Sequence, residues 1–167
     1  MLVFSCRDTG NDNNLFKGLI DKHEVAIFLN TYKLDNVPKE IGHLKNVKKL
    51  YIATDSVTGW TIYPPLSAID ERTSTPPFKY LPDEITQLVT LQRLSLIDLD
   101  LVALPDNFSN LENLDSLSLF MNKLTISNEI EKLKKLKNLK YIVLFGNKVD
   151  STDVQELRKA IPGIFIE

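Results

Sequence analysis

The chain has 167 residues, of which 43% are apolar, and this is enough material for one domain with a hydrophobic core. Its formal net charge of −2 argues against a protein that binds nucleic acid by neutralising phosphates. The single cysteine excludes a disulfide within the chain, and no apolar run is long enough to cross a bilayer.

The N-terminus begins with the apolar residues MLVFSC, which end in Cys6, and the polar stretch RDTGNDNN follows. This order is typical of the end of a bacterial lipoprotein signal, in which a cysteine receives a lipid and a tether follows. Phe4 is large for its position and the usual basic segment is missing, so this interpretation requires a start further upstream. The alternative is a frayed terminus with a chance cysteine. We expect residues 1–14 to be flexible, and a membrane contact only through a lipid on Cys6. If the true start lies upstream and Cys6 carries a lipid, we expect the protein in the cell envelope. If not, we expect it in the cytoplasm.

From residue 24 onward the sequence repeats. Apolar residues recur at positions 1, 4, 6 and 11 of each unit, and these steps fit neither a helix nor a strand alone. Two units have asparagine at position 9, namely Asn122 and Asn147. The C-terminal IPGIFIE predicts a sixth, closing strand with Ile164 and Ile166 at positions 4 and 6. The complete units begin at residues 24, 47, 91, 114 and 139.

The second half of the unit is shared as well. NVPKEIGHLKN, YLPDEITQLVT and ALPDNFSNLEN each have an apolar residue, a proline, and apolar residues four and seven positions after the first. Proline suits the first turn of a short helix, and the later apolar residues then share one face.

Together these motifs resemble the leucine-rich-repeat family in its 23-residue LPxxIxxL subtype, over residues 24–167. The resemblance implies an α/β solenoid of five or six repeats. A parallel sheet would line its concave face, and short helices or turns would form its convex face. It also implies that asparagine at position 9 bonds the backbone in the bend after each strand. Tyr32, Asp55 and Leu99 take that position in the other units, so we expect irregular bends there.

The two ends of a solenoid must be covered, because a terminal repeat otherwise exposes its core. NLFKGLIDKHE places apolar residues on one helical face and predicts an N-terminal cap from residue 15. STDVQELRKAI predicts a C-terminal helix that begins with Ser151 or Thr152 as its cap. We therefore expect one repeat domain over residues 15–167.

Positions 3, 5 and 7 of each unit face the concave side in this family, and six of them carry an aromatic residue. Exposed aromatic side chains on one face indicate a binding surface, because they give large contact area at low entropic cost. Lys49 and Arg93, at position 3, would add polar anchors. The alternative is that strands favour aromatic residues in any case. The aromatic residues are Phe28, Tyr51, Phe120, Tyr141, Phe145 and Phe165.

An insertion at about residues 58–79 lengthens the second unit and contains Trp60 and Tyr63. Insertions in repeat proteins emerge on one rim and often contribute to the binding face. The alternative is a loop that packs Trp60 and Phe78 back onto the solenoid. The lysine-rich stretch EIEKLKKLKNLKY is interpreted as a solvated helix face rather than a site for an anionic partner.

Catalytic and metal-binding patterns are missing from the sequence. His23 and His43 have no second ligand at helical spacing, and Cys6 has no histidine partner. Asp98 and Asp100 lack the glycine of a calcium loop, and no glycine-rich phosphate loop is present. We expect a protein that is not an enzyme and that has neither cofactor nor metal.

The expected function is non-catalytic recognition of another protein through the concave aromatic face and the 58–79 insertion. One alternative is a cell-surface adhesion or glycan-binding lipoprotein, in which Trp60 and tyrosines stack on sugar rings. A second alternative is the recognition subunit of an enzyme system whose catalytic chain is separate. The family alone does not choose among these, because it serves many partners.

Overall fold

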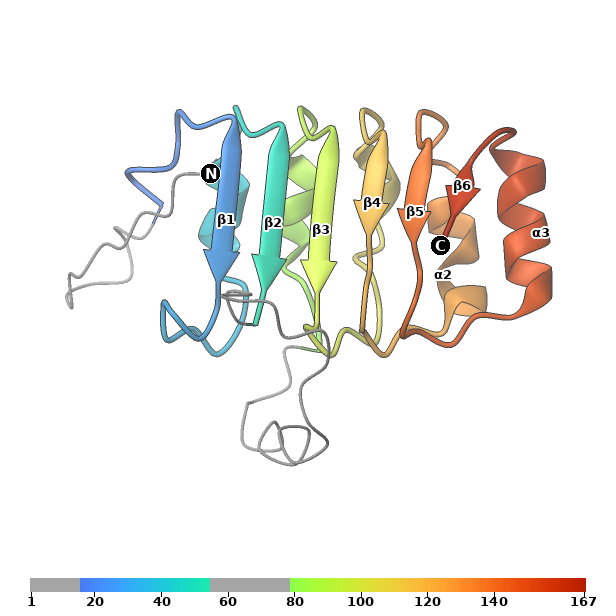
Figure 1. Cartoon of the computed structure of the whole chain (residues 1–167). Helices are drawn as coiled ribbons and strands as arrows, with labels where there is room; N and C mark the ends of the chain where they lie inside the picture. The colour runs from blue at the N-terminus through green and yellow to red at the C-terminus, as the bar shows by residue number, and fades with distance from the viewer. Residues whose placement is uncertain (1–15, 55–78) are drawn as a thin grey trace, which may run out of the picture.

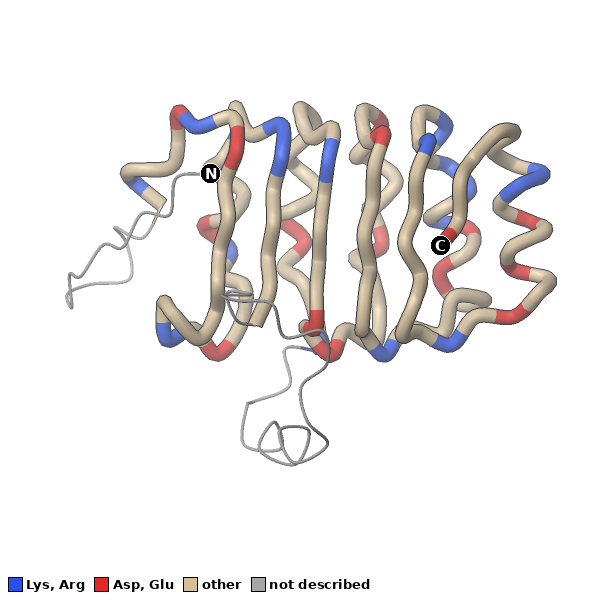
Figure 2. The backbone as a smooth tube through the Cα atoms, viewed as in Figure 1, with Lys and Arg blue, Asp and Glu red and all other residues tan. Residues whose placement is uncertain are grey.

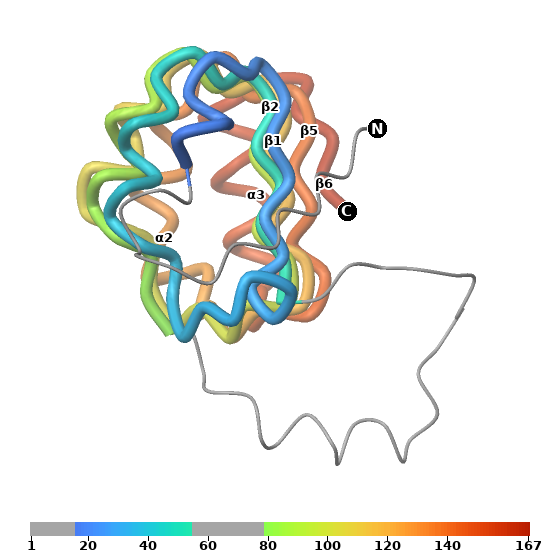
Figure 3. The backbone as a smooth tube through the Cα atoms, turned by 90° about the vertical axis from the view of Figure 1, so that its left-hand side faces the viewer, coloured from blue at the N-terminus to red at the C-terminus, as the bar shows by residue number. Residues whose placement is uncertain are grey.

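The computed structural model describes residues 16–54 and 79–167. Within these ranges six parallel strands lie in a single sheet in chain order, as Figure 1 shows. Viewed along the solenoid, the sheet forms one side of each coil and the helical segments form the other (Figure 3). The strands are β1 (Glu24–Phe28), β2 (Lys49–Ala53), β3 (Arg93–Ile97), β4 (Ser116–Ser118), β5 (Tyr141–Val143) and β6 (Phe165–Ile166).

The return segments are short helices of two kinds. Where the sequence has the LPxxIxxL motif, Pro38 and Pro82 hold an extended conformation and a 3₁₀ helix begins at the next residue. The return between β4 and β5 has no proline, and it forms a longer α-helix. The helices are η2 (Lys39–His43), η4 (Asp83–Gln87), η5 (Phe108–Asn110), α2 (Ile126–Leu133) and α3 (Ser151–Ala160).

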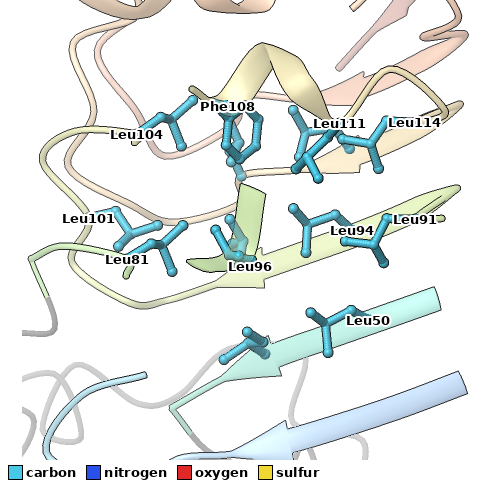
Figure 4. Close-up of a cluster of buried hydrophobic side chains, with 14 of the residues drawn as sticks. Leu50, Leu81, Leu91, Leu94, Leu96, Leu101, Leu104, Phe108, Leu111 and Leu114 are labelled. Carbon is cyan, nitrogen blue, oxygen red and sulfur yellow. The ribbon is translucent and has the colours of Figure 1, made fainter. Parts of the chain in front are cut away.

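The core lies between the sheet and the return segments. Leu94, Leu96 and Leu101, at positions 4, 6 and 11 of one unit, have no exposed surface. Figure 4 shows these side chains and their counterparts in neighbouring units pointing into the same narrow interior, which the side chain of Phe108 enters from η5. The leucine steps of three, two and five residues therefore follow from one strand, one bend and one return per coil, which confirms the predicted solenoid.

The first repeat is displaced from its predicted register by two residues. Val25 pairs with Leu50, whereas the sequence pattern placed Ile27 opposite Leu50. The prediction was wrong because side chains alternate with a period of two, so Val25, Ile27 and Leu29 fit either register equally well. The observed register puts Asn30, not Tyr32, at position 9. The backbone N–H of Asn30 donates to Thr54 O at 2.9 Å.

The last repeat is also displaced by two residues, in the opposite direction. Ile166 pairs with Ile142, although the sequence pattern placed Ile164 there. Ile164 lies before β6 and is buried, and its amide donates to Ile161 O. Because a shift of two keeps each side chain on its face, Phe165 still belongs to the concave face.

Both end caps differ in detail from their predictions. Helix α3 has Asp150 as its N-cap, one residue before the predicted Ser151 or Thr152, because the Asp153 carboxylate accepts the Asp150 amide at 2.9 Å. At the other end residues 16–21 form turns rather than the predicted helix, in keeping with the cost of nucleating so short a helix. Phe16 is nevertheless buried and covers the first coil.

Candidate functional site

The strand register arranges the concave face into three rows that run across the strands. The N-terminal row consists of the position-3 residues Glu24, Lys49, Arg93, Ser116, Tyr141 and Phe165. The middle row consists of the position-5 residues Ala26, Tyr51, Ser95, Ser118 and Val143. The C-terminal row consists of the position-7 residues Phe28, Ala53, Ile97, Phe120 and Phe145.

The C-terminal row is apolar, and its exposure rises towards β5. Phe120 and Phe145 stack with ring centroids 5.6 Å apart and planes 16° from parallel. They are 37% and 61% exposed, so the two rings contact each other without entering the core. Met121, 40% exposed, lies next to them, and Ile97 is half-buried. These side chains form an apolar patch on the concave face.

Met121 was not predicted from the sequence, and its backbone has an unusual conformation. Its φ of 56° lies in the left-handed region, where Gly146 with φ 83° occupies the equivalent bend of the next repeat. A Cβ added at Gly146 would lie 2.7 Å from Met121 Sδ, so the methionine side chain covers the Gly146 backbone. The signal in the sequence is a large apolar residue at position 8, where a bend favours glycine.

A second stacked pair lies in the N-terminal row. The Tyr141 and Phe165 rings are 5.4 Å apart and within 8° of parallel, and Phe165 is 61% exposed. The Tyr141 hydroxyl donates a hydrogen bond to the Glu167 carboxylate, and this bond raises the pKa of Tyr141 because it stabilises the protonated phenol. The two aromatic pairs thus lie at opposite ends of β5.

The third aromatic pair differs from the expectation that all six rings are exposed. Phe28 is only 7% exposed, because its ring packs against Tyr51 at 5.8 Å and the bend after β1 folds beside it, where the Tyr32 amide donates to Phe28 O. Tyr51 is half-buried, and burial raises the pKa of its phenol. Phe28 belongs to the packed part of the face, and only Tyr51 of this pair reaches solvent.

The predicted cations lie in the N-terminal row as expected. Lys49 Nζ is 2.5 Å from Glu24 Oε1, and this hydrogen bond lowers the pKa of Glu24 below its ordinary value. Arg93 is more open, because its side chain is 61% exposed and its Nε lies 4.0 Å from Asp115 Oδ1, too far for a hydrogen bond. Arg93 can therefore contact a partner without first breaking a strong ion pair.

Asparagine ladders fix the bends on both sides of the face. Asn122 is buried, and its Oδ1 accepts the amides of Leu99 and Leu101 while its Nδ2 donates to Leu96 O. Asn147 acts similarly one repeat later, as the resemblance implied. A second ladder, which sequence reasoning missed, lies at the opposite bends. There Asn113, Asn138 and Thr90 donate to backbone carbonyls of the preceding repeat.

Two lysines of the lysine-rich stretch are less solvated than predicted. Lys132 is only 21% exposed, and its Nζ contacts Glu129 Oε2 at 3.0 Å and Leu104 O at 2.6 Å. Lys134 bonds Glu131 at 2.6 Å. Lys132 and Lys134 therefore join neighbouring repeats, since Lys132 contacts Leu104 O and Lys134 also reaches Glu156 at 3.1 Å. Lys135, Lys137 and Lys140 are exposed, as expected for a solvated helix face.

Other predicted residues take structural positions or lie outside the described ranges. Asp100 forms an ion pair with Lys123 at 2.9 Å, and His23 Nδ1 lies 2.9 Å from Asn46 O. In the part of the chain that the structure describes, no group of three or more His, Cys, Asp or Glu residues could hold a metal. No helix there is long and apolar enough to span a bilayer. Cys6, Asp55, Trp60 and the insertion up to residue 78 lie outside the described residues.

The fold and the repeat pattern agree with the comparison to solved structures. An LRR protein from Leptospira interrogans shares 31% sequence identity over 80% of this chain, with a TM-score of 0.50. The chain is a leucine-rich-repeat protein. It spans about a third of the relative's length, since it covers 34% of that chain. The leucine-rich-repeat protein internalin C2 from Listeria monocytogenes is 20% identical, with a TM-score of 0.48 over 75% of this chain and 62% of that one. No family model matches the sequence, and no curated protein matches it.

Proposed function

We propose that this leucine-rich-repeat chain is a non-catalytic module that binds another protein through its concave face. The observation that carries the proposal is the stacked and exposed pair Phe120 and Phe145. A folded protein rarely leaves large aromatic side chains together in solvent unless they serve a contact. The likeness to another leucine-rich-repeat protein supports an interaction module in general terms.

Rigidity supports the same conclusion. The bend after the C-terminal row is held by the Asn122 and Asn147 amides, and the two rings are already stacked in the free protein. A partner therefore meets a surface that loses little conformational entropy on binding. Tyr51, Tyr141 and Phe165 extend the contact surface, and Arg93 and Lys49 supply its polar anchors.

The insertion at 58–79, with Trp60, belongs to this proposal as a second contact region. Its flanks are held at the bend after β3, because the Thr54 hydroxyl donates to Asp98 O and the Val102 amide donates to Lys79 O at 3.0 Å. The insertion therefore begins after the end of β2, and the chain resumes beside Val102, in the return after β3. We treat residues 15–167 as one domain with this insertion.

Affinity capture from the native cell tests the function. Wild type is compared with Phe120→Ala/Phe145→Ala, and with Tyr80→Ala, which removes an aromatic residue that is 65% exposed outside the sheet. We expect a protein that wild type and Tyr80→Ala retain equally and that the double variant loses at least about tenfold, because truncated hot spots cost roughly 1–3 kcal/mol each. Equal retention by all three proteins would contradict a concave site.

A further inference from the structure

We propose that Met121 is a reversible oxidation site in the apolar patch, at which a peroxide converts the thioether mainly into one epimer of methionine sulfoxide. The chemistry of this site goes beyond the proposed function, whereas its effect on a partner rests on the proposed function. The inference follows from three features of Met121, namely its backbone conformation, the contact of its sulfur with Gly146 and its exposure.

Met121 occupies a bend in which a methionine is unusual. Position 8 has a left-handed backbone in three successive repeats, with φ of 54° at Asp98, 56° at Met121 and 83° at Gly146. Aspartate and glycine adopt this conformation more readily than a residue with a long side chain does. The Met121 N–H donates to Phe145 O at 2.9 Å, and this bond holds the bend beside the exposed aromatic pair. An outlier of this kind, kept at a surface that is free for contact, points to a role for the side chain.

The sulfur of Met121 has one covered side. A Cβ built on Gly146 would lie 2.7 Å from Met121 Sδ, so the sulfur rests on the backbone of Gly146, where the missing side chain leaves a place for it. Met121 is nevertheless 40% exposed. One lone pair of the sulfur thus faces the protein, and a dissolved oxidant reaches the other. Because attack on each lone pair gives a different epimer, the fold should select one of them.

The oxidation step needs no catalytic group from the protein. The open lone pair of the Met121 sulfur attacks one oxygen of hydrogen peroxide, the O–O bond breaks and an S–O bond forms. The sulfur loses two electrons, and the departing hydroxide takes the proton of the attacked oxygen and leaves as water. The sulfoxide is reversible, because sulfoxide reductases return it to the thioether, each enzyme acting on one epimer.

Oxidation should change the patch more than the fold. Met121 is not part of the hydrophobic core. The sulfoxide oxygen would lie beside Phe120 and Phe145, and the strands β4 and β5 that lead to them carry no charged residue (Figure 2). A partner that covers this apolar surface would have to remove water from the new oxygen, which is unfavourable unless the partner supplies a hydrogen bond. The modification would therefore weaken binding at the concave face.

The chemistry is tested with dilute hydrogen peroxide and mass spectrometry. Trypsin releases Met121 in the fragment 94–123, apart from Met1 and Cys6, so an added mass of about 16 Da in this fragment reports one oxygen on Met121. Epimer-specific reductases applied to the digest then report the stereochemistry. We expect the folded chain to react at a rate within about tenfold of that in guanidinium chloride and to give one epimer in excess, while the unfolded chain gives both equally. Equal epimers from the folded chain, or a reaction slower than that limit, would overturn the site.

Affinity capture tests the effect on a partner once the peroxide has been removed. Treated and untreated wild type are compared with treated Met121→Leu, in which leucine keeps an apolar side chain and has no sulfur. We expect treated wild type to lose about tenfold of the protein that Phe120→Ala/Phe145→Ala also loses, and treated Met121→Leu to keep it. Full retention by treated wild type would overturn the effect on binding and leave the concave site standing. If the double variant loses nothing, the proposed function is wrong, and the fragment masses still decide the chemistry at Met121.

Discussion

Asn122 shows how a single side chain supports the face. Its amide contacts backbone groups of two repeats, and it is one of the few buried polar side chains in the described part of the chain. The sequence predicted this role from position 9 alone. It did not predict the bond at Leu99, which has position 9 in the previous repeat. The backbone N–H of Leu99 donates to Asn122 Oδ1, so Asn122 also holds the bend of the repeat that lacks its own asparagine.

Replacing Asn122 by alanine should lower the free energy of unfolding by about 2–4 kcal/mol. The buried amides of Leu99 and Leu101 and the carbonyl of Leu96 would lose their partner, and each unsatisfied buried group costs about 1–3 kcal/mol, reduced by relaxation. Urea denaturation measures the loss. Asn128→Ala, at an exposed position of α2, is the control and should change stability by less than about 0.7 kcal/mol. A loss in Asn122→Ala no larger than the control's would show that the ladder is dispensable.

Exposure at the residue scale could not be obtained from the sequence. Phe28 and Phe145 both occupy position 7, yet Phe28 is 7% exposed and Phe145 is 61% exposed. The difference depends on Tyr51 and on the path of the bend after β1, which come from other parts of the chain. A repeat pattern assigns a side chain to a face, and the neighbouring repeats decide whether the face is covered there.

At the element scale, helix α2 is tied to the preceding repeat by a buried carboxylate. Glu129 is 3% exposed, and its Oε2 accepts the Leu104 amide at 3.2 Å and the Lys132 ammonium at 3.0 Å. Helix α2, held by this contact, takes the place that the 3₁₀ helices after Pro38 and Pro82 have in earlier repeats. The sequence suggested an ordinary solvated face, because a glutamate in a charged stretch gives no sign of which acid is buried.

Glu129→Ala should therefore destabilise the protein by about 2–4 kcal/mol, since it leaves the Leu104 amide unpaired and the Lys132 charge partly buried. Glu131→Ala is the matched control on the same helix, because Glu131 is 73% exposed in its pair with Lys134 and exposed pairs contribute little. Thermal unfolding of the two variants decides the question. Similar melting temperatures would contradict a structural role for Glu129.

At the scale of the whole molecule, the architecture was predictable and the strand register was only partly so. Leucine steps of three, two and five residues define the coil, because one interior must accept three side chains from each strand and bend. The register of β1 and β6 was missed by two residues, because Val25, Ile27 and Leu29, like Ile164 and Ile166, satisfy two alignments. The assignment of side chains to the concave face was still correct, since a shift of two residues leaves each ring on the same side of the sheet.

The division of aromatic side chains between core and face is the central feature of the molecule. Phe108, the first residue of η5, is fully buried in the core, whereas Phe120 and Phe145 stack on the exposed side of the sheet. If the exposed rings serve recognition, they should contribute little to folding, and the buried ring should contribute much.

The most direct test is the unfolding free energy of Phe120→Ala/Phe145→Ala beside that of Phe108→Ala, both measured by urea denaturation. Truncating the exposed pair should cost about 1 kcal/mol, the scale of an aromatic contact in solvent. Truncating Phe108 should cost about 3–5 kcal/mol, because it leaves a cavity in the core. A loss of comparable size in the two proteins would show that Phe120 and Phe145 belong to the fold, and would contradict their assignment to a binding surface.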